Sequence, residues 1–211
     1  MGEELIHKWD KVLDSLYDEQ AKPLGLVVNF SRLLKQEKKT MVLDLGCGKG
    51  RHTVFLARQG FNVMAVDISS VALSQTLRRL KEQGLPAPLV QADLRRLPLP
   101  GNTFDALLSL SVLHHHCWSE MVVGVNEMYR VTKPGGYGLL TVALRHRPCY
   151  GTGELVETHS YLIDHGADQG IIHHFFDRQE ILQLFSEFTI VNARLTRPDQ
   201  GSWKVLLQKP Q

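Results

Sequence analysis

The sequence predicts an α/β fold in which a doubly wound, mostly parallel sheet carries helices on both faces. From residue 40 onward, short apolar runs alternate with segments of helical periodicity, which is the pattern of a parallel sheet covered on both sides. The first apolar run enters a glycine-rich turn that opens a helix. Two further apolar runs near the end of the chain are predicted to pair as a hairpin.

The first part of the chain is predicted to contain four helices and three strands. Helical periodicity with several charged residues covers two N-terminal segments, 3–20 and 24–38. Gly60 and Gly84 are expected to end the next two helices, because glycine readily adopts the left-handed conformation at a helix end. In chain order the strands cover residues 42–45, 62–66 and 89–91, and the helices between them cover residues 51–59 and 70–83.

The second part of the chain is predicted to contain two more strands, two helices and the closing hairpin. The tripeptide Pro134-Gly135-Gly136 stops one helix, and Asp177 is the expected N-cap of the other. Residues 145–176 carry prolines, glycines and histidines without strong periodicity, so we expect an irregular segment there. The helices cover residues 120–131 and 178–185, the strands cover residues 104–110, 137–144, 188–195 and 202–208, and the last two strands flank a turn at 197–201.

Length and composition predict an ordinary globular protein. A chain of 211 residues can bury its own core, so residues 1–211 are expected to form a single domain, as a monomer or a homodimer. The formal net charge of +2 argues against a nucleic-acid partner, which normally requires a clustered basic face. No apolar window approaches 18 residues, so no membrane span is expected. Cys47, Cys117 and Cys149 show neither metal-ligand spacing nor a disulfide framework, which predicts reduced thiols in a cytoplasmic protein.

The most informative stretch is residues 42–51, which read VLDLGCGKGR. It predicts a buried strand, a glycine turn and the start of a helix, a geometry that lets a nucleotide-like ligand lie against bare backbone. Glycines stand at alternate positions 46, 48 and 50, which is not the G-x-G-x-x-G spacing of pyrophosphate-binding loops. Asp44 precedes the turn, and a carboxylate there favours a ligand that carries an ammonium group.

This stretch resembles the first motif of the class I S-adenosylmethionine (SAM)-dependent methyltransferases. Asp67, Asp93 and the tetrapeptide Lys133-Pro134-Gly135-Gly136 follow in the order of that family, so the resemblance covers about residues 40–143. It is nearest to the tellurite-resistance and ubiquinone-biosynthesis types. The resemblance implies a Rossmann-like, seven-stranded sheet with one antiparallel strand in the C-terminal hairpin. It also implies SAM as cofactor, S-adenosylhomocysteine as product, and a transferase of the EC 2.1.1 class.

The resemblance and the spacing together assign a cofactor site. Asp67 lies about 20 residues beyond the glycine turn, where a carboxylate can accept both ribose hydroxyls, although Asp67 or the pair Ser69-Ser70 could also cap the next helix. The resemblance implies that Asp93 accepts from the adenine amine, while a plain turn-starting aspartate is the alternative. The complete set is Asp44, Leu45, Gly46, Cys47, Gly48, Gly50, Asp67, Ile68, Asp93, Leu94, Ser109 and Leu110.

The acceptor side shows less pattern. We divide the domain into an N-terminal helical cap (1–38), a SAM-binding core (40–143), an acceptor-side loop or lid (145–176) and a closing helix and hairpin (177–211). The N-terminal helix either packs on the sheet edge or closes the site. Residues expected to contact the acceptor are Trp9, Tyr17, His114, Tyr150 and His174.

Histidines offer the only candidates for a catalytic base, His114 or His115. Adjacent histidines on an extended chain point to opposite faces, so the run at 114–116 would offer at most two nitrogens to one ion. No partner carboxylate is placed by spacing, and we therefore expect no metal.

The leading functional hypothesis is methyl transfer from SAM to a small molecule by in-line displacement. Residues 110–115 also resemble the fourth motif of methyltransferases that esterify wobble uridines in tRNA, but the charge balance argues against RNA. A SAM-binding protein without catalysis would present the same cofactor residues. A nicotinamide-dependent oxidoreductase is the most distant alternative, because the glycine spacing does not fit it.

Overall fold

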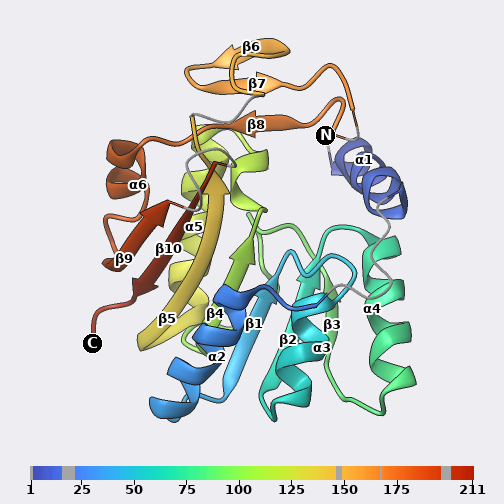
Figure 1. The fold of residues 1–211 in the computed structure, drawn as a ribbon, viewed down its shortest axis with the longest axis vertical. Coiled ribbons are helices and arrows are strands. Elements are labelled where there is room, and N and C mark those ends of the chain that lie inside the picture. Colours follow the sequence, from blue (N-terminus) through green and yellow to red (C-terminus); the bar gives the residue numbers. More distant parts are fainter. Residues whose placement is uncertain (1, 16–21, 146–148, 167, 196–200) are drawn as a thin grey trace.

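The computed structural model describes residues 2–15, 22–145, 149–166, 168–195 and 201–211, and it contains one large sheet and one small sheet (Figure 1). In the large sheet every neighbouring pair is parallel up to β5, and β10 is antiparallel to both strands beside it. The predicted seven-stranded sheet with one antiparallel strand is therefore confirmed. Its spatial order is β3 (Leu89–Gln91), β2 (Asn62–Asp67), β1 (Met41–Leu45), β4 (Phe104–Leu110), β5 (Thr132–Ala143), β10 (Ser202–Gln208) and β9 (Thr189–Leu195).

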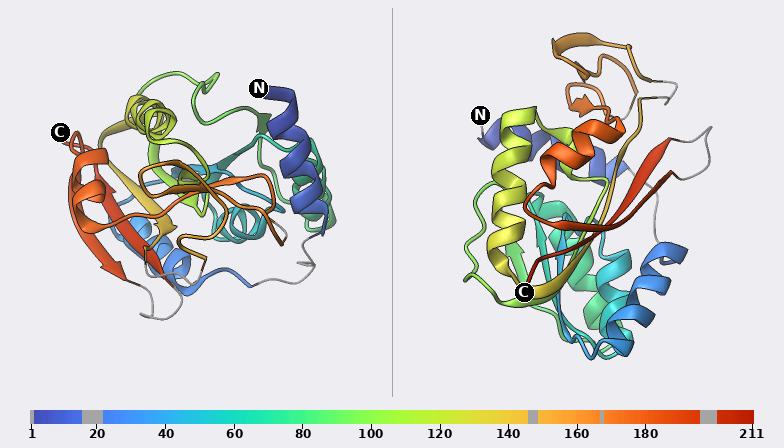
Figure 2. Two further views of the ribbon diagram at one scale, coloured as in Figure 1. Left: turned by 90° about the horizontal axis from the view of Figure 1, so that it is seen from above. Right: turned by 90° about the vertical axis from the view of Figure 1, so that its left-hand side faces the viewer.

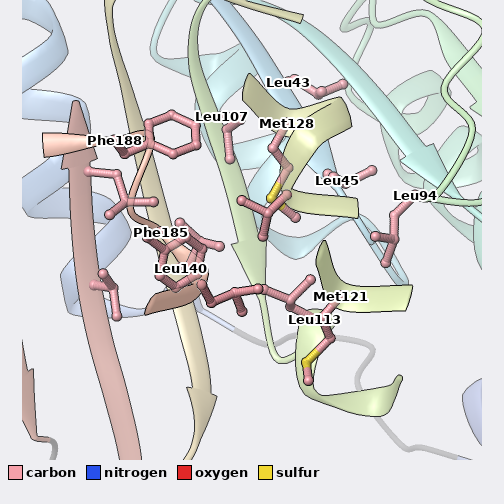
Figure 3. Close-up of a cluster of buried hydrophobic side chains, with 14 of the residues drawn as sticks. Leu43, Leu45, Leu94, Leu107, Leu113, Met121, Met128, Leu140, Phe185 and Phe188 are labelled. Carbon is pink, nitrogen blue, oxygen red and sulfur yellow. The ribbon is translucent and has the colours of Figure 1, made fainter. Parts of the chain in front are cut away.

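Helices cover both faces of this sheet, as Figure 2 shows from the side. One face carries α2 (Gly25–Gln36) and α3 (Arg51–Arg58), whose apolar side chains pack on β1, β2 and β4. The helix α4 (Ser70–Glu82) contacts α3. The other face carries α5 (Trp118–Val131) and α6 (Arg178–Leu184). Figure 3 shows the core between α5 and the sheet, where Leu43, Leu107 and Met128 lie among other buried apolar side chains.

The predicted elements occur with shifts at their ends. The strand β5 begins at Thr132, five residues before the predicted start. The Pro-Gly-Gly segment, which was predicted to lie before this strand, is part of it. The helix α5 begins two residues earlier than predicted, at Trp118. Asp177 caps α6 as predicted: its carboxylate accepts a hydrogen bond from Glu180 N at 2.9 Å. Ser69, not Asp67, caps α4 by accepting from Ala72 N at 3.1 Å.

The prediction that residues 145–176 are irregular is wrong. This segment contains an antiparallel sheet of three short strands, β6 (Glu154–Glu157), β7 (Ser160–Leu162) and β8 (Ile172–His174). Three or four residues per strand are too few to give a detectable alternation of apolar and polar residues. The small sheet lies beyond the carboxyl ends of the parallel strands, next to α1 (Gly2–Ser15) (Figures 1 and 2).

The helix α1 is attached to the large sheet by a polar contact. Asp10 Oδ1 accepts hydrogen bonds from Ser69 Oγ and, at 3.4 Å, from Val71 N. Since Ser69 is the N-cap of α4, this contact fixes α1 against the loop that follows β2. Among the described helices, none is long and apolar enough to cross a membrane.

Asp105 lies at the amino ends of the parallel strands and links two of them. Its Oδ2 accepts from Thr40 N at 3.0 Å and Met41 N at 2.8 Å, and Lys133 Nζ lies 2.8 Å from Oδ1. Burial alone would raise the pKa of Asp105, but these hydrogen bonds and the Lys133 charge lower it to about 2. Asp105 therefore joins the starts of β1 and β5.

We predict that Asp105→Asn lowers the free energy of unfolding by about 1–3 kcal/mol at pH 7, since charged hydrogen bonds of this kind contribute that much. The folded pKa lies below the unfolded value, so the wild-type advantage is present above about pH 4 and disappears as the pH falls through about 2. Urea unfolding at several pH values measures this. Asp164→Asn is the control: Asp164 is exposed and pairs with the exposed His165, so this variant should leave the midpoint unchanged. A constant difference between wild type and Asp105→Asn down to pH 2 would contradict the assignment.

Candidate functional site

A cavity of about 510 Å³ lies at the carboxyl ends of β1, β2 and β4. Open α/β sheets bind their ligands at this edge, and the volume is within the usual range for small-molecule sites. Its floor is formed by the glycine turn after β1 and by residues that follow β2, β3 and β4. The helix α1 covers it through Leu5, Trp9, Val12 and Leu13, and its far end is formed by histidines.

The three glycines of the turn are needed for different reasons. All have left-handed backbone, with φ of +74° at Gly46, +54° at Gly48 and +79° at Gly50. A Cβ on Gly46 would lie 2.2 Å from Val112 Cγ2, and one on Gly50 would lie 2.7 Å from Thr76 Cγ2. A Cβ on Gly48 would meet only Leu13 Cδ2, at 3.9 Å, and Gly48 lines the cavity. The absence of a side chain at Gly48 therefore leaves space open in the cavity.

Asp67 ends β2 with its carboxylate at this turn. Oδ2 accepts from Gly48 N at 2.8 Å and Oδ1 accepts from Ser69 N at 2.9 Å. The residue is only 7% exposed, and burial raises the pKa of Asp67 despite these hydrogen bonds. Each carboxylate oxygen has a second lone pair, so Asp67 can accept two further hydrogen bonds from a ligand in the cavity.

Asp44 lies behind the cavity wall and is not one of the residues that line it. It is 3% exposed, and its Oδ2 accepts a hydrogen bond from Thr53 Oγ1 at 2.6 Å. Burial raises the pKa of Asp44 to about 6, and the negative charge of Asp67 adds to this effect. Two other predicted residues, Gly50 and Ser109, are also absent from the lining. Their predicted cofactor contacts stay predictions.

Cys47 lines the cavity as a neutral thiol. Burial, together with the nearby Asp67 and Asp44 carboxylates, raises the pKa of Cys47 well above its ordinary value. Its Sγ donates to Gly48 O at 3.6 Å. Because only the thiolate is an effective nucleophile, Cys47 contributes shape rather than chemistry.

Asp93 has the turn-starting role that was one of the alternatives predicted from the sequence, and its predicted adenine contact stays a prediction. It starts a turn, since Oδ1 accepts from Arg95 N at 2.8 Å, and it also lines the cavity. Burial would raise the pKa of Asp93, but the hydrogen bonds and charge of Arg95 outweigh it and hold the pKa below the usual range. Arg95 also pairs with Glu120, which fixes this turn to α5. Leu94 and Ile68 line the cavity on the same side.

Histidines form the far end of the cavity. His114 and His115 lie on η1 (Leu113–His115), a single 3₁₀ turn, and His173 comes from β8. The premise that the run 114–116 is extended is therefore wrong. Burial lowers the pKa of His115 to about 3, with a further contribution from His173, so its ring is neutral at pH 7. Trp9 packs edge-on against His115, with ring centroids 4.8 Å apart.

Of the other residues predicted to contact the acceptor, two line the cavity and two do not. Trp9 and His114 line the cavity as expected. Tyr150 and His174 do not: Tyr150 Oη contacts His159 Nδ1 at 3.0 Å, and His174 Nδ1 contacts Ser160 Oγ at 2.8 Å. Tyr17 lies outside the described residues.

Several lining residues were missed by the sequence reasoning. Lys49, Arg51 and His52 line the cavity next to the glycine turn, and the motif itself could have signalled them. Leu5 and Val12 share the face of α1 that carries Trp9, so helical spacing could also have found them. Ser111, which adopts a left-handed φ of +58° after β4, and Asp168 had no sequence signal.

Comparison with known proteins supports the resemblance. Residues 42–136 match the model of a family described as a methyltransferase domain. An uncharacterized methyltransferase of Bacillus subtilis, YodH, is 35% identical over 95 residues, which are 45% of this chain and 40% of that protein. A fatty-acid O-methyltransferase of Mycolicibacterium smegmatis is 36% identical over 115 residues, 54% of this chain and 39% of that protein. The chain thus spans about two fifths of the length of these relatives.

The crystal structure of a SAM-dependent methyltransferase from Methanosarcina mazei has the same fold. It superimposes with a TM-score of 0.75 at 22% identity, and the match covers 90% of this chain and 99% of that one. The predicted family resemblance and the predicted fold are therefore confirmed.

We predict that Gly48→Ala weakens SAM binding more than tenfold, because the added methyl group would occupy the space kept open in the cavity. Gly84→Ala is the matched control: Gly84 has a similar φ of +62°, and its Cβ would meet nothing within 4 Å. Both variants carry the strain of a left-handed alanine, about 1–2 kcal/mol. Thermal unfolding measures the loss of stability caused by backbone strain, and calorimetric titration with SAM measures the loss of affinity caused by the methyl group in the cavity. Normal affinity in Gly48→Ala would remove the turn from the site.

Proposed function

We propose that this chain, in which residues 42–136 form a methyltransferase domain, transfers the methyl group of SAM to a small-molecule acceptor. The observation that carries the proposal is the cavity itself. It combines a ligand-sized space over Gly48, a buried carboxylate at Asp67 and a separate end lined by His114 and His115. Two ends of different chemistry suit two reactants.

The residues present fit SAM. Asp67 would accept the ribose hydroxyls, and the apolar Ile68 and Leu94 would lie against the adenine with Asp93 at its edge. The turn at Gly46 and Gly48 would bind the amino-acid portion of SAM. Asp44 would act on its ammonium group from behind the wall, through the charge of its carboxylate.

Bound SAM supplies a methyl group on a positively charged sulfur. The chain then has to hold the acceptor in line with that group and exclude water. The apolar face of α1 serves the second purpose, because Leu5, Trp9 and Leu13 cover the cavity. The His115 ring, neutral because its pKa is about 3, can orient an acceptor through a ring nitrogen.

A small acceptor is favoured over tRNA by the volume of the cavity, about 510 Å³, and by the charge balance of the chain. The histidine end lies between α1, η1 and β8, and the formal net charge is only +2. The similarity to a fatty-acid O-methyltransferase supports an organic small molecule as acceptor. The proposal includes a cytoplasmic location, supported by the three free cysteines, and a monomer or homodimer.

We predict that Asp67→Asn removes the preference of the protein for adenosine over 2′,3′-dideoxyadenosine. Hydrogen bonds to a charged acceptor contribute about 1.5–3 kcal/mol, so wild type should prefer adenosine at least about tenfold. Asp44→Asn is the control, because Asp44 is also a buried carboxylate but lies behind the wall and should keep the preference. Competition calorimetry measures both ratios. An unchanged ratio in Asp67→Asn would refute ribose recognition by this residue.

Transfer itself is tested with methyl-tritiated SAM and a panel of fatty acids, phenols, thiols and tRNA. We expect label in a small molecule. Label in tRNA alone would favour the wobble-uridine alternative. Tight SAM binding without transfer to any member of a broad panel would favour a binding protein without catalysis.

A further inference from the structure

Three imidazoles meet at the acceptor end of the cavity. The ring centroids of His114 and His115 are 4.1 Å apart, those of His115 and His173 are 4.5 Å apart, and those of His114 and His173 are 5.7 Å apart. One ring nitrogen from each residue lies within 4.8 Å of the other two. Packed aromatic rings alone would explain the contacts, but they would not require three nitrogens to converge.

The separation of these nitrogens is close to that of a metal site. Imidazole nitrogens bind Zn²⁺ at 2.0–2.1 Å, so two ligands of a tetrahedral ion are about 3.4 Å apart. Nitrogens within 4.8 Å of one another reach that spacing when each side chain moves by about 1 Å or less. The 3₁₀ turn matters here, because it brings His114 and His115 to the same side of the chain.

The surroundings of the rings match those of metal-binding histidines. His173 Nε2 lies 3.4 Å from Asp168 Oδ2, and both ring nitrogens of His173 are buried without a hydrogen-bond partner among the described residues. His115 Nδ1 is likewise buried without a partner in the described part of the chain, and the backbone of Ile172 is a hydrogen-bond partner of the same ring. A histidine ligand typically donates its other N–H to a carboxylate or a backbone carbonyl.

We propose that His114, His115 and His173 bind a divalent transition-metal ion, with Asp168 orienting the His173 ring. Nitrogen ligands select Zn²⁺, Co²⁺, Ni²⁺ or Cu²⁺ over Mg²⁺ and Ca²⁺. All four residues line the cavity, so an ion with three protein ligands keeps an open position toward it. If the proposed function holds, that position takes an anionic oxygen or sulfur of the acceptor, which makes a carboxylate, phenolate or thiolate the acceptor class.

The test uses an untagged protein of residues 1–211, freed of metal by chelation. We expect calorimetric titration with ZnCl₂ to give one ion per chain, and Co²⁺ to give the visible absorption of a tetrahedral site with nitrogen ligands. His115→Gln and His173→Gln should abolish this binding, and Asp168→Asn should weaken it about 10–100-fold. His165→Gln is the matched control, because His165 and Asp164 form an exposed His–Asp pair whose ring and carboxylate are 2.6 Å apart.

The wild-type titration decides the proposal even where a variant fails to fold. No stoichiometric Zn²⁺ binding by wild type, or equal binding by wild type and a folded His173→Gln, overturns it. Titration of the same samples with SAM tests the proposed function independently of the metal site. SAM binding without metal binding refutes the metal site alone, whereas metal binding without SAM binding refutes the proposed function alone.

Discussion

The turn between β1 and α3 is the constraint on which the site depends. Gly46 N and Cys47 N both donate to Val66 O, at 2.7 and 3.0 Å, which fixes the turn against the end of β2 directly before Asp67. The missing side chain of Gly46 leaves the space that Val112 occupies, immediately before the histidines of η1. One glycine turn therefore positions a carboxylate at one end of the cavity and the imidazoles at the other. A side chain at Gly46 would disturb both ends together.

Two buried carboxylates beside this turn determine which ligands the cavity favours. Asp44 and Asp67 are almost entirely removed from water, and the charge of Asp67 contributes to the raised pKa of Asp44. Neither carboxylate forms an ion pair with a described Lys, Arg or His. A ligand with an ammonium and a sulfonium charge relieves this repulsion, whereas the pyrophosphate of a dinucleotide would add to it. The electrostatics thus favour SAM over a nicotinamide cofactor on a sheet that could accommodate either.

The sequence predicted the large sheet because its strands are apolar runs punctuated by glycine and proline, and it predicted Gly48 and Asp67 because both stand inside that pattern. It could not predict the small sheet, whose strands are too short to show a period, nor the 3₁₀ turn at His114 and His115, where no residue type specifies the geometry. Lys209 is a further example. It reads as a solvated residue near the end of the chain, yet its ammonium group is buried and donates to Asn102 Oδ1, Tyr129 O and Thr132 O. Tertiary packing determines such positions, and the periodicity of apolar residues in the sequence does not reveal it.

Sequence similarity to relatives covers the residues at one end of the cavity more completely than those at the other. The family match ends at residue 136, and it includes the glycine turn, Asp67 and Asp93. The helix α1 and the residues Asp168 and His173, which enclose the acceptor end, lie outside that match. Identity to a relative within residues 42–136 therefore bears on the cofactor end and on η1, but not on α1, Asp168 or His173. Because the proposed acceptor end is formed by α1, η1, β8 and Asp168, the chemistry of those few side chains is the evidence that bears on the proposed acceptor.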